Sequence, residues 1–114
     1  MNLKDLPKCP IETTIMMLGC KWKILIIREL LTGTKRFNEL KKSVKGITQK
    51  VLTTKLRQME ELGIVERKIY QQTPPKVEYT LTDIGYTLAP VLDSMKSWGK
   101  DFRKYTKLLA NSKL

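Results

Sequence analysis

The sequence predicts a mainly α-helical α+β fold in which several helices accompany one small β-hairpin. Apolar residues recur every three or four positions in most of the chain, which is typical of helices buried on one face. Apolar and polar residues alternate only within residues 64–81. The last helical pattern is much longer than the others and continues almost to residue 114. The whole chain of 114 residues is long enough for one domain with a core of moderate size.

A first helix is expected to begin at Pro10, after an N-terminal arm of residues 1–8. Proline is favoured at the first helical position, because the N–H that it lacks has no helical partner there. This places Cys9 at the N-cap, and Gly19 is a natural stop. One face of the helix carries three apolar residues, Ile11, Ile15 and Leu18.

A second helix is expected over residues 21–32, with Gly33 ending it. A helix that is apolar on most of its circumference belongs in the middle of a core. Its apolar residues are Trp22, Leu25, Ile26, Ile27, Leu30 and Leu31. Residues 34–37 can then pair briefly as a strand.

Residues 36–63 predict two helices joined by a turn that contains Gly46. Their apolar stripes consist of Phe37, Leu40 and Val44, and of Leu52, Leu56 and Met59. The opposite face of the second helix, Thr48 to Leu62, carries Gln49, Lys50, Thr53, Thr54 and Arg57. This pattern is typical of a helix-turn-helix, whose second helix enters the major groove of DNA. Such side chains suit base edges and phosphates.

Residues 64–81 predict a hairpin directly after the helix-turn-helix, which is the position of the wing in a winged helix. Val77, Tyr79 and Leu81 alternate with polar residues. Two prolines within residues 72–75 prevent a continuous ladder there, so this segment forms the tip. Lys68 and Lys76 are expected near the tip, within reach of the minor groove or its phosphates.

The segment of residues 82–110 predicts a long C-terminal helix that Thr82 can cap. Its apolar residues are Leu88, Leu92, Met95, Trp98, Phe102, Tyr105 and Leu109, close to a repeat of about 3.5 residues. Pro90 predicts a kink or two abutting helices. A domain of this size has too little other apolar surface to cover this stripe. A homodimer is therefore expected, with Ile11 and Ile15 contributing to the interface. The alternative is that the helix folds back on its own domain.

Charge and composition favour a polyanionic partner over an enzymatic function. The chain has 22 Lys and Arg against 11 Asp and Glu, and residues 35–57 hold eight cations against Glu39 alone. Such a local field attracts nucleic acid. The chain has no histidine, which excludes histidine-based catalytic dyads and metal sites. Two cysteines are a poor zinc set, and no phosphate-binding glycine motif occurs. The sequence therefore predicts no enzyme, no metal and no cofactor.

The N-terminus and the cysteine content favour the cytoplasm. Residues 1–10 lack the apolar segment of a signal peptide, and the longest apolar run, Ile24 to Ile27, is too short to span a membrane. Cys9 and Cys20 do not make a disulfide framework.

Six segments together resemble the HxlR-type transcriptional regulators, which are related in fold to the MarR regulators. They read CPIE, GCKWK, RFNEL, GITQKVL, LGIVER and PPKVEY, and the resemblance covers roughly residues 9–105. It implies a single winged-helix domain over residues 9–110 in a bacterial homodimer that binds a pseudo-palindromic operator, as repressor or activator. One departure is Cys20, where the family usually has glycine.

The predicted DNA contacts divide by position. Thr48, Gln49 and Lys50 are expected deepest in the major groove, with Gln49 suited to adenine and Lys50 or Arg57 to guanine or phosphate. Thr53 and Thr54 suit thymine methyls or phosphates. Phosphate contacts outnumber base contacts at such interfaces. Contacts to phosphates are expected for Arg36, Lys41 and Lys42.

Cys9 is a second candidate site, because helix N-termini and cations such as Lys8 favour the reactive thiolate. Glu12 opposes this effect. Some members of the resembled family sense oxidants or electrophiles such as quinones through a cysteine at this position. Redox sensing through Cys9 is therefore a hypothesis, and the alternative is an inert N-capping cysteine. Cys20 is expected to be packed.

Three functions remain open on the sequence alone. The first is a sequence-specific transcription regulator, the second a non-specific architectural DNA-binding protein, and the third a winged-helix module that binds an acidic protein. The polar strip of residues 49–57 favours DNA over the third. A small ligand between the dimer helices, near Trp22 and Trp98, is a further possibility, although aromatic residues at helical spacing are more often core.

Overall fold

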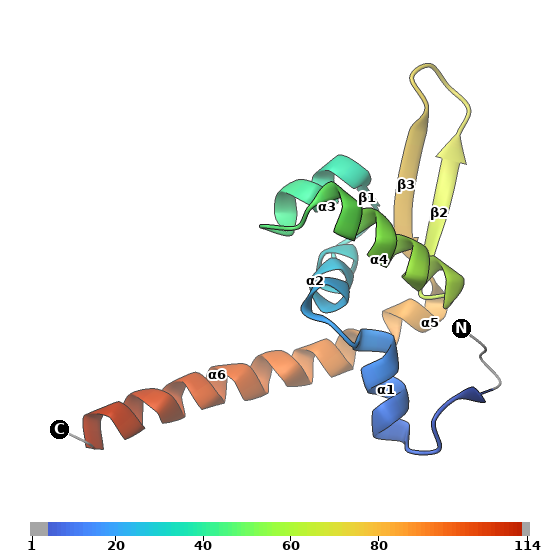
Figure 1. Ribbon diagram of the computed structural model, residues 1–114. Helices are drawn as coiled ribbons and strands as arrows, with labels where there is room; N and C mark the ends of the chain where they lie inside the picture. The colour runs from blue at the N-terminus through green and yellow to red at the C-terminus, as the bar shows by residue number, and fades with distance from the viewer. Residues whose placement is uncertain (1–4, 113–114) are drawn as a thin grey trace.

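The computed structural model describes residues 5–112, in which six helices accompany a three-stranded sheet (Figure 1). The elements in chain order are α1 (Pro10–Leu18), α2 (Lys21–Leu30), β1 (Lys35–Arg36), α3 (Phe37–Ser43), α4 (Gln49–Glu61), β2 (Val65–Tyr70), β3 (Lys76–Leu81), α5 (Asp83–Tyr86) and α6 (Ala89–Ser112). The predicted α+β class and the order of elements are confirmed. Half of the predicted N-terminal arm, residues 1–4, lies outside the described residues.

The core is built around α2, as its apolar circumference predicts. Ile26, Ile27 and Leu30 are almost fully buried, and α2 contacts α1, α3, α4 and α6. Leu40 and Val44 come from α3 and its C-cap, Leu52, Leu56 and Met59 from α4, and Val65 and Leu81 from the paired strands β2 and β3. Burial of each such aliphatic side chain contributes about 1.5–3 kcal/mol, so these contacts fix α3 and α4 on α2.

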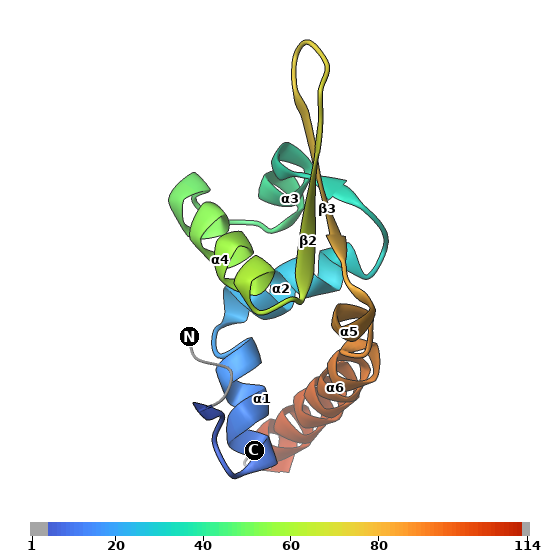
Figure 2. The ribbon, with the colours of Figure 1, turned by 90° about the vertical axis from the view of Figure 1, so that its right-hand side faces the viewer.

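The sheet is antiparallel, with strand order β1-β3-β2. The predicted short strand before the helix-turn-helix is Lys35–Arg36, and Lys35 pairs with Tyr79. β2 and β3 pair from Val65 opposite Leu81 to Tyr70 opposite Lys76. Their far ends project from the helical body as the wing (Figure 2).

The C-terminal segment is two abutting helices rather than one helix over residues 82–110. Thr82 caps the short α5, since its hydroxyl accepts a hydrogen bond from the N–H of Gly85 over 3.2 Å. The interruption falls at residues 87–88, and Pro90 occupies the first turn of α6, where its missing N–H costs no helical hydrogen bond. The sequence therefore predicted the break, which lies just before Pro90.

Long helix α6 leaves the body on a different side from the wing and has no buried residue (Figure 1). Leu88 and Leu92 pack against the domain's own core, so two residues predicted for the dimer interface have intrachain partners. The rest of the stripe is open: Trp98 is 68% exposed, and Met95, Phe102, Tyr105, Ile11 and Ile15 are also exposed. None of the helices within residues 5–112 is long and apolar enough to cross a membrane.

Candidate nucleic-acid interface

The N-terminus of α4 is held by two features of the preceding turn. Gly46 has φ +87°, a conformation that residues with a Cβ rarely adopt, and it reverses the chain after α3. Thr48 is the N-cap, and its hydroxyl accepts a hydrogen bond from the N–H of Val51 over 3.1 Å. The first turn of α4 is therefore fixed relative to α3.

The predicted strip on α4 lies opposite the buried stripe. Gln49, Lys50, Thr54 and Arg57 are exposed, whereas Thr53 is half-buried. The Thr54 hydroxyl donates to the carbonyl of Lys50 over 2.9 Å, so it already has a backbone partner. The strip thus presents the amide of Gln49 and the cations of Lys50 and Arg57 to solvent, with Thr53 and Thr54 between them in the sequence.

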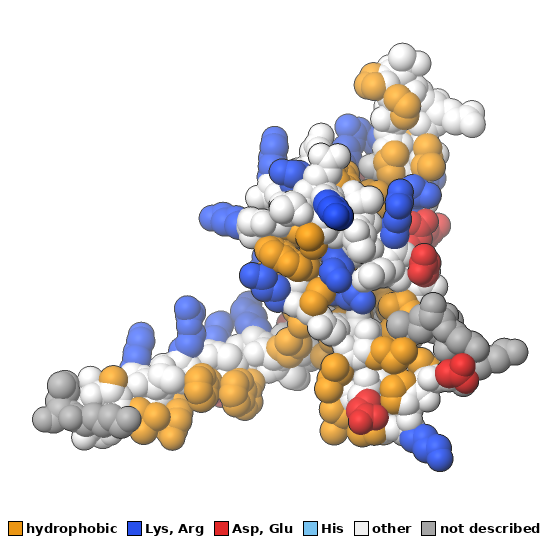
Figure 3. Space-filling view, viewed as in Figure 1, with side chains coloured by type: hydrophobic (Ala, Val, Ile, Leu, Met, Phe, Trp, Pro, Cys, Tyr) orange, Lys and Arg blue, Asp and Glu red, His pale blue; other side chains and the backbone are white. Residues whose placement is uncertain are grey.

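Cations from α3 and its N-terminus flank this strip. Arg36, Lys41 and Lys42 are exposed, and the N–H of Arg36 donates to the Glu39 carboxylate over 3.0 Å. That bond uses Glu39, the one acidic residue within residues 35–57, to begin α3. Lys and Arg side chains gather over α3 and α4 in Figure 3.

On the wing, the two predicted cations surround an aromatic ring. The ammonium groups of Lys68 and Lys76 lie 5.0 Å and 4.8 Å from the centroid of the Tyr70 ring. The Lys76 ammonium also lies 3.8 Å from a carboxylate oxygen of Glu78. Lys76 is therefore partly neutralised, and Lys68, which is exposed, is the freer of the two cations.

An ion pair beside Tyr79 connects the wing to α4. Burial raises the pKa of the Tyr79 phenol above its ordinary value, and Arg67 nearby opposes that effect. Arg67 lies 3.6 Å from a carboxylate oxygen of Glu60 on α4. The root of the wing is thus joined to the C-terminal half of α4 by an ion pair beside a neutral phenol.

A second cationic surface escaped the sequence reasoning. Figure 3 shows Lys and Arg side chains along one edge of α6 and apolar side chains along the opposite edge. The spacing of three and four residues that predicts the apolar stripe also identifies this surface, which consists of Lys96, Lys100, Arg103 and Lys107.

The two cysteines lie in different environments, and both are free thiols. Cys9 is exposed at the N-cap of α1, and its side chain makes no capping hydrogen bond. Cys20 is half-buried and lines an apolar groove of about 570 Å³ between α1, α2 and α6. Cys9 lies at the N-cap, where the sequence places it, and is the more accessible of the two.

No group of three or more His, Cys, Asp or Glu side chains among residues 5–112 could hold a metal ion. The residues that the structure brings together at α3, α4 and the wing are cations, amides and hydroxyls. They can form hydrogen bonds and ion pairs with an anionic surface.

Comparisons with known proteins agree with this arrangement. The HxlR-like helix-turn-helix family matches residues 17–107. The uncharacterised HTH-type transcriptional regulator YdeP of Bacillus subtilis is 48% identical over 99 residues, which are 87% of this chain and 77% of YdeP.

Two redox-related regulators have similar structures. The redox regulator HypR in its oxidised form is 47% identical, with a TM-score of 0.77 over 82% of this chain and 96% of that one. The reduced form of the regulator YodB from B. subtilis is 40% identical, with a TM-score of 0.74 over 84% and 95% of the two chains. Family, relatives and fold agree, so this chain belongs to the HxlR-like helix-turn-helix family and is a transcriptional regulator, not an enzyme.

Proposed function

We propose that the protein acts as a homodimer that binds a pseudo-palindromic operator, with α4 reading bases in the major groove. One observation carries the proposal. The exposed face of α4 presents Gln49, Lys50 and Arg57, and the cap at Thr48 fixes the turn that positions them. Glutamine and lysine or arginine recognise adenine and guanine edges in the major groove, so this face can discriminate between sequences.

In this proposal the remaining cations bind the DNA backbone. Arg36, Lys41 and Lys42 are exposed on α3 and at its N-cap, and Lys68 adds an exposed cation on the wing. Each phosphate that is neutralised releases counterions, which makes the affinity depend strongly on salt. Two copies related by a twofold axis would place their α4 helices about 34 Å apart, one turn of DNA.

The exposed apolar stripe supports the homodimer. Met95, Trp98, Phe102 and Tyr105 lie on one side of α6, and the rings of Trp98 and Phe102 stack with centroids 5.2 Å apart. Exposed apolar patches of this kind on soluble proteins usually mark interfaces. Ile11 and Ile15 of α1 are exposed as well and extend the proposed interface.

The proposed signal is oxidation or electrophilic modification of Cys9. The thiol is exposed at the start of α1, beside Lys8 and close to the isoleucines of the proposed interface. HypR in its oxidised form and diamide-treated YodB are structurally similar regulators, which favours this signal over others. Modification there would alter the interface and thereby the relative positions of the two α4 helices.

Fluorescence anisotropy tests the proposed function directly. The purified protein is titrated onto duplexes from upstream of its own and neighbouring genes, with scrambled duplexes at the same salt as the reference. Affinity about a thousandfold tighter for one native fragment supports specific regulation. Equal, salt-sensitive binding to every duplex favours an architectural protein, and no binding favours a module for an acidic protein.

A further inference from the structure

Lys23 on α2 is the one buried charged or polar residue among residues 5–112, with 8% of its surface exposed. No described carboxylate lies within 4.0 Å of its ammonium, and no described residue accepts a hydrogen bond from it. Every fully enclosed side-chain nitrogen of the described residues has a hydrogen-bond partner. The Lys23 nitrogen has no such partner, so it is not fully enclosed and must border an open space.

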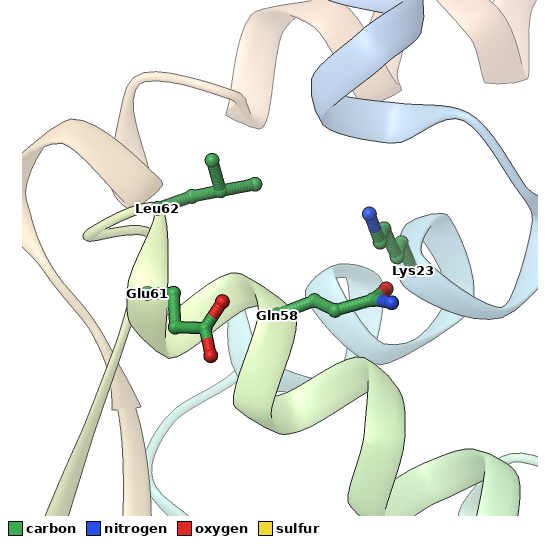
Figure 4. Close-up of a pocket in the computed structure, with 4 residues that line it drawn as sticks. All are labelled: Lys23, Gln58, Glu61 and Leu62. Atoms are coloured by element: carbon green, nitrogen blue, oxygen red, sulfur yellow. The ribbon is translucent and has the colours of Figure 1, made fainter. Parts of the chain in front are cut away.

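That space is a cavity of about 460 Å³ between α2 and the C-terminal end of α4. Lys23 lines it from α2, and Gln58, Glu61 and Leu62 line it from α4 and its C-cap (Figure 4). Small-molecule sites usually measure about 300–1,000 Å³, so the cavity has the size of a ligand site. It is separate from the DNA-facing strip, which lies on the exposed side of α4.

The charges around the cavity select the class of ligand. Lys23 and Glu61 both line it, yet they do not form an ion pair with each other. A simple anion would be repelled by Glu61 and a simple cation by Lys23. A zwitterion satisfies both groups, and Leu62 offers an apolar wall for a side chain.

We propose that this cavity binds a free apolar α-amino acid. Its carboxylate pairs with the Lys23 ammonium, its ammonium group pairs with the Glu61 carboxylate, and its side chain packs against Leu62. Gln58 contributes an amide that can donate to the carboxylate. Charge-assisted hydrogen bonds of this kind are the stronger ones in proteins, and they replace the water that otherwise solvates both groups.

Bound ligand would connect α2, the centre of the core, with the end of the recognition helix α4. If α4 can adopt two positions relative to α2, a ligand that binds the protein more tightly in one of them shifts the population toward that conformation. The amino acid would thus change operator affinity, a consequence that rests on the proposed function. Binding itself does not depend on DNA.

Isothermal titration calorimetry without DNA tests the site on the full chain. The probes are L-leucine, L-methionine and L-phenylalanine, with L-leucinamide lacking the carboxylate and 4-methylpentanoate lacking the amino group. We expect at least one amino acid to bind, and both leucine analogues to bind more weakly than leucine if leucine is that ligand. Absence of binding by all three amino acids at millimolar concentration overturns the proposal.

Two variants assign the contacts. Lys23→Met and Glu61→Gln are each expected to weaken binding of that amino acid at least about tenfold, the loss of one charge-assisted contact. Lys100→Met and Glu66→Gln remove an exposed cation and an exposed carboxylate elsewhere and are expected to bind as the wild type does. Circular dichroism checks that each variant is folded. Undiminished binding by folded Lys23→Met and Glu61→Gln overturns the assignment.

The anisotropy assay with an operator duplex, repeated with and without the amino acid, separates the two proposals. Binding of the amino acid by a protein that binds no specific duplex contradicts the proposed function and leaves the site intact. Specific operator binding without any amino-acid binding contradicts the site alone.

Discussion

The hydroxyl of Thr48 accepts a hydrogen bond from the N–H of Val51 over 3.1 Å, so the first residue expected to meet DNA also caps the recognition helix. A threonine engaged in this way fixes the helix terminus from which Gln49 and Lys50 project. The cap and the proposed base readers are adjacent in sequence, and loss of the cap therefore affects how those side chains are presented.

Thr48→Ala is expected to lower the free energy of unfolding by about 1 kcal/mol, the usual cost of losing an N-cap hydroxyl. It should also weaken binding to cognate and scrambled duplexes alike, because the helix terminus frays. Chemical denaturation and anisotropy measure the two effects. Thr48→Ser keeps the acceptor oxygen and serves as the control, and a Thr48→Ser protein as impaired as Thr48→Ala would contradict the capping role.

Lys50→Ala is expected to reduce discrimination, with a loss of about 1–3 kcal/mol at the base pair that Lys50 reads. Lys41→Ala should instead weaken all sequences equally and lower the salt slope by about one, as expected for a phosphate contact. Cognate and scrambled duplexes compared over a salt series distinguish these results. If Lys50→Ala behaves as Lys41→Ala does, Lys50 contacts only phosphate.

Cys9→Ser is expected to bind operator as the wild type does but to lose any response to diamide. The thiol is exposed and makes no capping hydrogen bond, so its replacement leaves α1 unchanged. Cys20→Ser is the matched control and should keep the response, because that thiol is half-buried. Unchanged DNA binding by diamide-treated wild type, or a response that persists in Cys9→Ser, would argue against a sensor at this position.

Trp98→Glu is expected to convert the proposed dimer to monomer at micromolar concentration. The ring is 68% exposed in the single chain, and a buried tryptophan at an interface commonly contributes about 2 kcal/mol or more. Sedimentation velocity measures the result. Ser97→Glu introduces the same charge at the neighbouring position, on another face of α6, and should remain dimeric. A dimeric Trp98→Glu protein would place the interface elsewhere.

Gly85→Ala is expected to destabilise the fold by about 1–3 kcal/mol, because an added methyl group overpacks the site. A Cβ at this position would collide with the carbonyl oxygen of Ile64 and lie 3.2 Å from the Cβ of Leu81. Gly99→Ala is the control, since nothing lies within 4 Å of a Cβ there, and alanine favours a helix by about 1 kcal/mol. Thermal unfolding compares the two, and equal melting temperatures would contradict this packing.

The arrangement of the helices and the faces of α4 could be predicted from the sequence, because burial imposes a period on the side chains. Leu52, Leu56 and Met59 recur at helical spacing and are buried, and the polar strip between them is largely exposed. The same reasoning placed the break near Pro90. These features depend on residues that are close together in the chain, so the sequence alone shows them.

Contacts between distant elements could not be predicted in the same way. Lys68 lies opposite Glu78 only in the register that the wing adopts. The burial of Lys23 could not be predicted either, because it depends on where the end of α4 meets α2. Such juxtapositions arise from packing, which no single segment specifies.

The outer part of α6 has a consequence for how much regulator a cell needs. Residues 94–112 are exposed apart from the partly buried Gly99, and an amphipathic helix in a protein takes most of its stability from packing of its apolar face. In the proposed dimer, folding of this segment is therefore coupled to encounter with a second copy, and the melting temperature rises with protein concentration. Dilution would unfold this outer segment and separate the two DNA-binding halves together, so the number of chains per cell sets a threshold for operator occupancy.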